Sequence, residues 1–238
     1  MKRIFVPTTG GRDWQRLLAK PELHWKPGKS AMTAAACWEA AATALPPEVK
    51  AALDASGEAS LANLELLFAI PEWEVELPGG TTTSCTDVMA LGSNATGLTA
   101  IAVEAKVDEP FGPTLGEKRR GASDKQRQRL DFLHAQVGIK APLQDEVRYQ
   151  LLHRTASAIL TARYFHARTA AMIVQSFSPA SMWWADFEQF CLALGVSAKK
   201  GVAARVPGSS TPELFVGWCV GEQHFRLVDL RTGAETGP

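Results

Sequence analysis

The 238-residue sequence lacks three features, each of which would assign it to a specialised class of protein. No hydrophobic run is long enough to span a bilayer, neither sign of charge is in excess, and cysteines number only four. Lysine plus arginine equals aspartate plus glutamate, at 25 each. Because binding to nucleic acid through net charge requires a basic protein, any such contact must use a local basic patch or metal ions that offset acidic residues.

Cysteine usage and the N-terminus both favour a cytoplasmic protein. Cys37, Cys85, Cys191 and Cys219 are scattered and have no CxxC spacing, which is typical of reduced, buried thiols rather than of disulfides or a zinc site. The start MKRIFVPTTGG has two basic residues but no apolar segment or cleavage site of a secretory signal. With 46% hydrophobic residues and no repeat or linker, residues 1–238 are expected to form one domain.

Hydrophobic periodicity and capping signals predict an alternation of helices and strands. Helices are expected over residues 29–45, 47–55, 123–138, 145–167 and 181–194, and strands over 64–77, on both sides of GSNATG within 86–107, over 169–177 and in a final hairpin over 213–230. The helix at 123 begins with a capping box, SDKQ, and ends at Gly138. This order predicts an α/β sandwich with a mixed sheet, in which one strand returns after an antiparallel meander of three.

The hairpin TDVMALGSNATGLTAIAVEAKV, residues 86–107, carries Asp87 on one arm and Glu104 and Lys106 on the other. Side chains alternate along a strand, so Glu104 and Lys106 share a face with small alanines, whereas the opposite face is uninterruptedly apolar. The small residues are expected to leave room for something to approach this face. Asp87 and Glu104 are equidistant from the turn centre, which predicts cross-strand neighbours about 5 Å apart at Cβ.

Two opposed carboxylates repel each other, but a divalent cation between them would reverse the sign of the interaction. Hard oxygen ligands suit Mg²⁺ or Mn²⁺. Lys106 could then hold a nucleophilic water or a phosphate oxygen, so the residues predict metal-assisted hydrolysis of a phosphodiester. The alternative is a plain surface ion pair within Glu-x-Lys.

An acidic residue in the second strand, Glu-x-Lys in the third, an Ala-rich helix before them and a helix and strand after them resemble the PD-(D/E)XK nuclease superfamily over about residues 30–178. The resemblance implies a restriction endonuclease-like three-layer sandwich, with residues 179–238 as an extension made of a helix and a hairpin. It also implies that Asp87 and Glu104 bind Mg²⁺ or Mn²⁺ and that Lys106 is the catalytic lysine. Glu39 in CWEAA is the best match to the family's first-helix glutamate, although an ordinary exposed helix residue is the alternative.

Further residues are candidates for contacts around this site. Glu74 would lie near Asp87 if PGGT is the turn, as an extra or rival ligand, but an exposed strand face is favoured for it. The densest basic stretch, residues 117–129, contains Arg119 and Arg120, which could bind phosphates. Gln150 and Arg154 lie one turn apart on a predicted helix and could also reach phosphate. Solvated faces of loops and helices explain the same residues.

The sequence thus predicts a magnesium-dependent hydrolase of the nuclease class that acts on DNA in preference to RNA, and it leaves open whether the enzyme is an endonuclease or an exonuclease. Two alternatives remain open: a catalytically inactive nuclease-fold protein that binds nucleic acid or protein, and a coincidental motif in an unrelated α/β protein. No membrane partner is expected. A homodimer would suit cutting of two strands, and the sequence leaves the oligomeric state open.

Overall fold

A mixed, open sheet organises the fold. The computed structural model describes residues 10–139, 142–209 and 211–231, which form one six-stranded sheet in the order β1-β2-β3-β4-β6-β5. The strands are β1 (Glu65–Val75), β2 (Ser84–Asn94), β3 (Gly97–Lys106), β4 (Thr169–Ser176), β5 (Val202–Arg205) and β6 (Glu213–Val220). β4 is parallel to both β3 and β6, and the other neighbours are antiparallel. The predicted α/β class, the meander and the returning strand are confirmed. Most of the N-terminal segment judged unlike a secretory signal, residues 1–9, lies outside the described residues.

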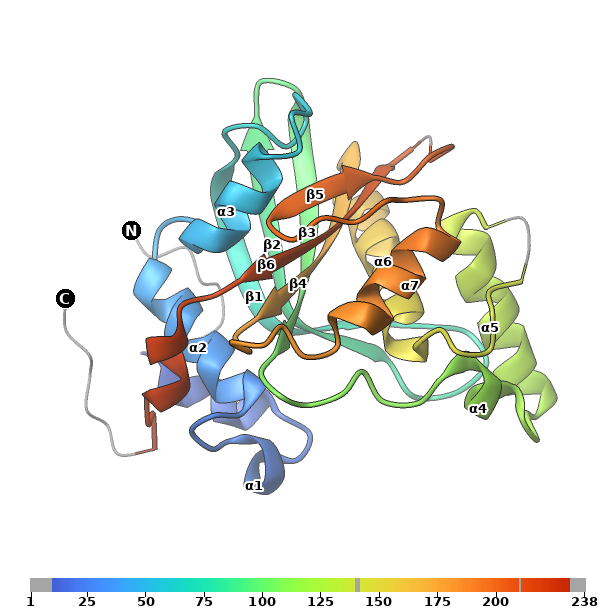
Figure 1. The fold of residues 1–238 in the computed structure, drawn as a ribbon, viewed down its shortest axis with the longest axis horizontal. Helices are drawn as coiled ribbons and strands as arrows, with labels where there is room; N and C mark the ends of the chain where they lie inside the picture. Colours follow the sequence, from blue (N-terminus) through green and yellow to red (C-terminus); the bar gives the residue numbers. More distant parts are fainter. Residues whose placement is uncertain (1–9, 140–141, 210, 232–238) are drawn as a thin grey trace.

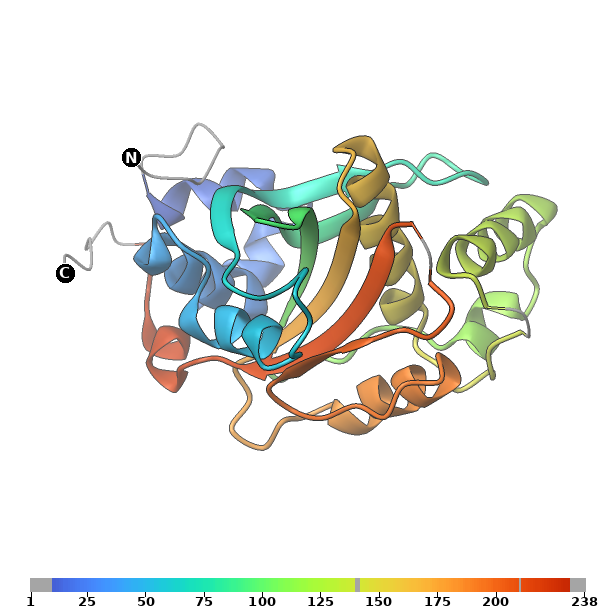
Figure 2. The ribbon, with the colours of Figure 1, turned by 90° about the horizontal axis from the view of Figure 1, so that it is seen from above.

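Helices cover both faces of this sheet (Figures 1 and 2). Before the sheet come η1 (Gly11–Leu17), α1 (Pro21–His24), α2 (Ser30–Ala41) and α3 (Pro47–Asp54), and after the meander come α4 (Leu115–Arg119), α5 (Asp124–Val137), α6 (Tyr149–Tyr164), α7 (Trp184–Ala193) and η2 (Gln223–Leu227). The first group packs on one face together with η2, and α5, α6 and α7 lie on the other. The chain is therefore layered as helices, sheet and helices.

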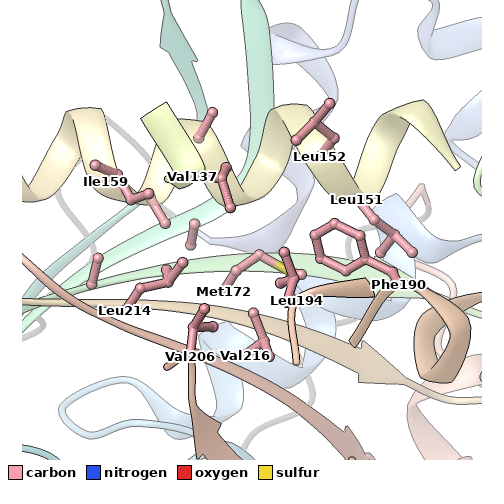
Figure 3. Close-up of a cluster of buried hydrophobic side chains, with 14 of the residues drawn as sticks. Val137, Leu151, Leu152, Ile159, Met172, Phe190, Leu194, Val206, Leu214 and Val216 are labelled. Carbon is pink, nitrogen blue, oxygen red and sulfur yellow. The ribbon is translucent and has the colours of Figure 1, made fainter. Parts of the chain in front are cut away.

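Two hydrophobic cores, one on each face, result from the alternation of side chains along the strands. On β3, Ala102 joins the core beneath α6, whereas Ile101 and Val103 join the core beneath α2. Figure 3 shows side chains of α6, β4, β6 and α7 meeting in the first core. Every residue of β4 is buried. Its near-continuous apolar run follows from a central strand that is covered on both faces.

Helix ends follow the sequence signals where a cap is present. The amide of Gln126 donates to Ser123 Oγ at 3.3 Å, and the amide of Ser123 donates to Gln126 Oε1 at 2.8 Å, so α5 has the predicted capping box. Gly138 ends α5 with φ 74°, a left-handed conformation that glycine adopts without strain. α6 begins at Tyr149, four residues later than the predicted start at Asp145.

The predicted C-terminal hairpin over residues 213–230 is wrong in its position. β6 pairs with β5, which precedes it in the chain, and residues 223–227 form the 3₁₀ helix η2. Both edges of β6 are occupied, by β4 and by β5, so no edge is left for a strand that follows Val220. β5, β6 and α7 all come from the predicted extension, and they join the same sheet and core.

Candidate functional site

Three carboxylates lie in a row across the first three strands. Pro71 pairs with Val88 and Trp73 with Thr86, so Glu72 on β1 lies opposite Asp87 on β2. Val88 pairs with Val103, and one further step of this register brings Asp87 opposite Glu104 on β3. The amide of Ala105 donates to Asp87 Oδ2 at 2.8 Å, which fixes the carboxylate beside β3. Like charges at opposed positions repel, so the row needs compensating cations.

Those cations come from β3 itself and from α6, and both bind Glu104. Lys106 Nζ lies 2.6 Å from Glu104 Oε1, and Arg154 Nε lies 2.5 Å from Glu104 Oε2. Gln150 Nε2 also donates to Oε1, at 2.7 Å. Glu104 and Lys106 are only 2% and 5% exposed. Burial alone would raise the pKa of Glu104, but the charges of Lys106 and Arg154 outweigh burial and lower this pKa to about 2.

The room that the small alanines leave on the charged face of β3 is taken by a helix. Ala100 and Ala102 are buried in the core beneath α6, so their small side chains let this helix approach the sheet closely. The approach brings the first turns of α6, with Gln150 and Arg154, onto the charged end of β3. The alanines thus position the partners of Glu104 instead of making room for a ligand.

The other two carboxylates of the row favour their protonated forms. Burial raises the pKa of Asp87 well above its ordinary value, and the negative charges of Glu104 and Glu72 raise it further. Burial also raises the pKa of Glu72 to about 7, although a hydrogen bond from the Cys85 thiol to Oε2, at 3.0 Å, opposes this shift. The backbone of Glu72 has a φ of 51°, a conformation uncommon outside glycine that often marks a functional position.

All three carboxylates and Lys106 line one cavity of about 620 Å³ at the C-terminal end of β3. The walls also include His153 and Tyr149 of α6 and Lys118 of α4. Lys118 Nζ lies 5.0 Å from the centroid of the Tyr149 ring, so a cation sits over an aromatic face at the rim. The cavity therefore combines an acidic floor with a basic and aromatic rim.

The donor set of this cavity decides which cation could bind there. Among the residues that the structure describes, no three or more His, Cys, Asp or Glu side chains converge closely enough to hold a metal ion. Mg²⁺, however, is commonly held by one or two carboxylates, while water and substrate phosphates complete its octahedron. Asp87 Oδ1 accepts no hydrogen bond from any described residue, so it is free to be a ligand. Asp87 and Glu104 therefore fit a magnesium ion that has few protein ligands.

A family model described as a domain of unknown function, DUF6946, matches residues 7–223. The chain belongs to the DUF6946 family. The matched region of this DUF6946 protein contains the whole six-stranded sheet and every residue of the cavity. Neither the comparison with curated proteins nor the comparison with solved structures returned a match.

Glu39, the predicted first-helix glutamate, lies away from the cavity. Its side chain accepts a hydrogen bond from Trp14 Nε1 at 2.8 Å, on the face of the sheet that carries α2. The N-terminal end of α2, at Ser30, is the end that reaches the cavity. At a rise of about 1.5 Å per residue, Glu39 is roughly 13 Å further along the helix axis.

The predicted basic contacts are divided between the cavity and the surface of this DUF6946 protein. Arg119 pairs with Asp145 and donates to the carbonyl of Leu143 at 2.8 Å, and neither it nor Arg120 lines the cavity. Gln150 and Arg154 are at the site, but both bind Glu104. None of the helices that the structure describes is long and apolar enough to cross a membrane.

Glu72 is the site residue that sequence reasoning missed, because Glu74 was placed beside Asp87 instead. Glu74 is exposed, and the register of β1 with β2 shows that it pairs with Cys85. The signal was present in the loop length: pairing Val75 with Ser84 puts position 72 opposite position 87. No pattern in the sequence marks His153 or Lys118 as site residues, because their positions at the cavity depend on how α6 and α4 pack.

Proposed function

We propose that this DUF6946 protein is a metal-dependent phosphodiester hydrolase, a nuclease, that uses Mg²⁺ or Mn²⁺. The observation that carries the proposal is the cross-strand pair of Asp87 and Glu104 with Lys106 two residues further on β3, all lining one cavity. Carboxylates of this kind at the C-terminal end of a strand that has a parallel neighbour lie where α/β sheets commonly bind ligands.

The topology supports a restriction endonuclease-like fold. α2 precedes the meander β1-β2-β3, α6 follows it, and β4 returns parallel to β3. Asp87 lies on the second strand and Glu104 and Lys106 on the third, as the PD-(D/E)XK resemblance implies. We propose that α2 and α6 are the two helices that flank the nuclease core and that residues 179–238 extend its sheet.

Asp87 and Glu104 would hold the ion, which when bound supplies Lewis-acid activation of a phosphoryl oxygen and of water. Lys106 is held beside Glu104, and its ammonium can orient the attacking water or neutralise a phosphate oxygen. Lys118, at the rim, can contact a neighbouring phosphate. Gln150 holds Glu104 Oε1 and so keeps the carboxylate directed at the cavity. DNA is the favoured substrate over RNA.

A second candidate function is a nuclease-fold module that binds nucleic acid or protein without cleaving it. The observation that favours it is that both oxygens of Glu104 are engaged by internal cations and that no ready-made cluster of three ligands exists among the described residues. An inactive descendant of a nuclease could keep its carboxylates neutralised in this way.

Metal-dependent cleavage of single- and double-stranded DNA and RNA separates these functions. The nuclease predicts cleavage with Mg²⁺ or Mn²⁺ that falls at least about 100-fold in Lys106→Ala and persists in Lys125→Ala, an exposed lysine on α5. Binding of the same nucleic acids without cleavage would favour the inactive module. Neither binding nor cleavage by the folded wild type would reduce the motif to coincidence, and equal cleavage by all three proteins would indicate a contaminating nuclease.

A further inference from the structure

Arg154 is a cation buried within the carboxylate site. It is 8% exposed, its Nε binds Glu104 Oε2 at 2.5 Å, and its Nη1 donates to Ser84 Oγ at 3.1 Å. A buried charge persists only when it is paired and hydrogen-bonded, and Arg154 meets both conditions. The guanidinium therefore occupies one side of Glu104 as a fixed charge.

Behind Arg154 lies a hydrogen-bonded cluster of polar groups, made of Ser84, His153 and Ser157. Ser84 Oγ lies 2.8 Å from His153 Nδ1 and accepts a hydrogen bond from Ser157 Oγ, also at 2.8 Å. Burial and the charge of Arg154 lower the pKa of His153 well below its ordinary value, so the imidazole is neutral. Ser84 Oγ thus has hydrogen-bond contacts with His153 Nδ1, Ser157 Oγ and Arg154 Nη1, and Ser157 Oγ also donates to the carbonyl of His153 at 2.8 Å. This network holds the guanidinium in one orientation.

The position of Arg154 limits what else can bind Glu104. In sites with two metal ions, the ions lie about 3.5–4 Å apart and commonly share a carboxylate. Here Oε2 of Glu104 faces Arg154, whose guanidinium is also held by Ser84 Oγ. Oε1 accepts hydrogen bonds from Lys106 and Gln150, so a metal ion that binds Glu104 has to displace one of these two donors from Oε1. The row of Glu72, Asp87 and Glu104 carries three negative charges at most, and Lys106 and Arg154 offset two of them. One divalent ion therefore suffices to neutralise the remainder.

We infer that Arg154 is a built-in cation that takes the place of a second divalent ion at Glu104, so that the site binds no more than one metal ion. This inference rests on the proposed function for the roles of Asp87 and Glu104 as cation ligands. Removing the guanidinium should open a second cation position on Oε2. Keeping a positive charge at residue 154 should keep that position closed.

Titration of the metal-free protein with Mn²⁺ by calorimetry, together with thermal unfolding, tests the inference. The variant is Arg154→Met, and the control on the same helix is Arg163→Met, which removes an exposed arginine. Wild type should bind at most one Mn²⁺, and Arg154→Met should bind one more ion than wild type. In EDTA, Arg154→Met should lose about 10 °C in Tm through the unpaired Glu104, and Mn²⁺ should restore part of that loss. Arg154→Lys and Arg163→Met should keep the wild-type stoichiometry.

Two wild-type ions, or the same Mn²⁺ stoichiometry in Arg154→Met and in wild type, would overturn the inference. If Arg154→Met does not fold, Arg154→Gln removes the charge but keeps a hydrogen-bond donor, and it should also bind one more ion than wild type; equal stoichiometry, or two ions in wild type or in Arg154→Lys, contradicts a closed position. The outcomes also separate this inference from the proposed function. If Arg154→Met binds Mn²⁺ and wild type does not, the cation role of Arg154 is supported, and the proposed function of wild type as a metal-dependent nuclease fails. One ion in both proteins leaves the nuclease proposal intact and refutes the role of Arg154.

Discussion

Glu72→Gln is expected to stabilise the protein at neutral and alkaline pH and to leave its stability near pH 4 unchanged. Burial raises the pKa of Glu72 from 4.5 to about 7, so the folded state resists its ionisation. Each pKa unit corresponds to about 1.4 kcal/mol, which makes the ionised carboxylate cost about 3 kcal/mol of unfolding free energy above pH 7. Because the pKa of Glu72 is higher in the folded state than in the unfolded state, wild type has its full stability with respect to this group below pH 4.5. It loses about 3 kcal/mol as the pH rises through 7.

Glutamine keeps the shape of glutamate, and its Oε1 can still accept the hydrogen bond from Cys85. The free energy of unfolding of the variant should therefore exceed that of wild type by about 3 kcal/mol at pH 8, which corresponds to a Tm roughly 6–12 °C higher for a chain of this size. At pH 5 the difference should be less than about 1 kcal/mol. Chemical denaturation at pH 4, 5 and 8 measures the difference. Glu74→Gln, on the exposed part of β1, is the control and should change stability by less than about 0.5 kcal/mol at any pH. Equal stability of Glu72→Gln and wild type at pH 8 would refute the claim that burial disfavours the ionised form of Glu72.

Three further predictions follow from the same contacts. Asp87→Asn should raise stability at pH 8, since the pKa of Asp87 is also raised by burial and by its acidic neighbours, and it should abolish cleavage; a variant that stays fully active would remove Asp87 from the site. Affinity for Mg²⁺, measured by calorimetry, should rise between pH 5 and 8, and binding should release protons. The reason is that the pKa of Asp87 is raised, so its carboxyl group must lose a proton before it can bind the ion; a pH-independent affinity would contradict this. Ala102→Leu should cost about 1–3 kcal/mol in chemical denaturation, because α6 leaves no room over β3, whereas the exposed Ala40→Leu should cost less than about 0.5 kcal/mol.

Local patterns predicted the elements that depend on neighbours in sequence. The equidistance of Asp87 and Glu104 from the GSNATG turn gave their register, because a hairpin fixes pairing through its turn. The capping box at Ser123 gave the start of α5, since cap and partner lie within one turn. The returning strand β4 followed from its short, wholly apolar run between two helices.

Features that depend on packing between distant elements were not predictable. The alanines of β3 indicate a close approach, but the sequence does not say whether a helix or a ligand makes it. Arg154 and Gln150 carry the periodicity of a solvated helix face, yet they are at the site because α6 crosses the end of β3. Glu39 matched a family position by sequence order, whereas its distance from Ser30 along α2 keeps it out of the cavity.

The C-terminal error has a similar cause. The segment after Val220 alternates apolar and polar residues as a strand would, and the sequence cannot show that both edges of β6 are already paired. β5 is only four residues long, too short for its own alternation to be recognised. Sheet edges are a property of the whole fold, so the pairing of the last strand was the least predictable part.

The central claim is that Asp87 and Glu104 together hold a divalent cation, and anomalous scattering from crystals soaked in Mn²⁺ tests it most directly. The account predicts a single peak within about 2.5 Å of a carboxylate oxygen of Asp87 and of Glu104, beside Lys106, and no peak there in Asp87→Asn. A peak elsewhere, or none at an Mn²⁺ concentration that supports cleavage, would contradict the account.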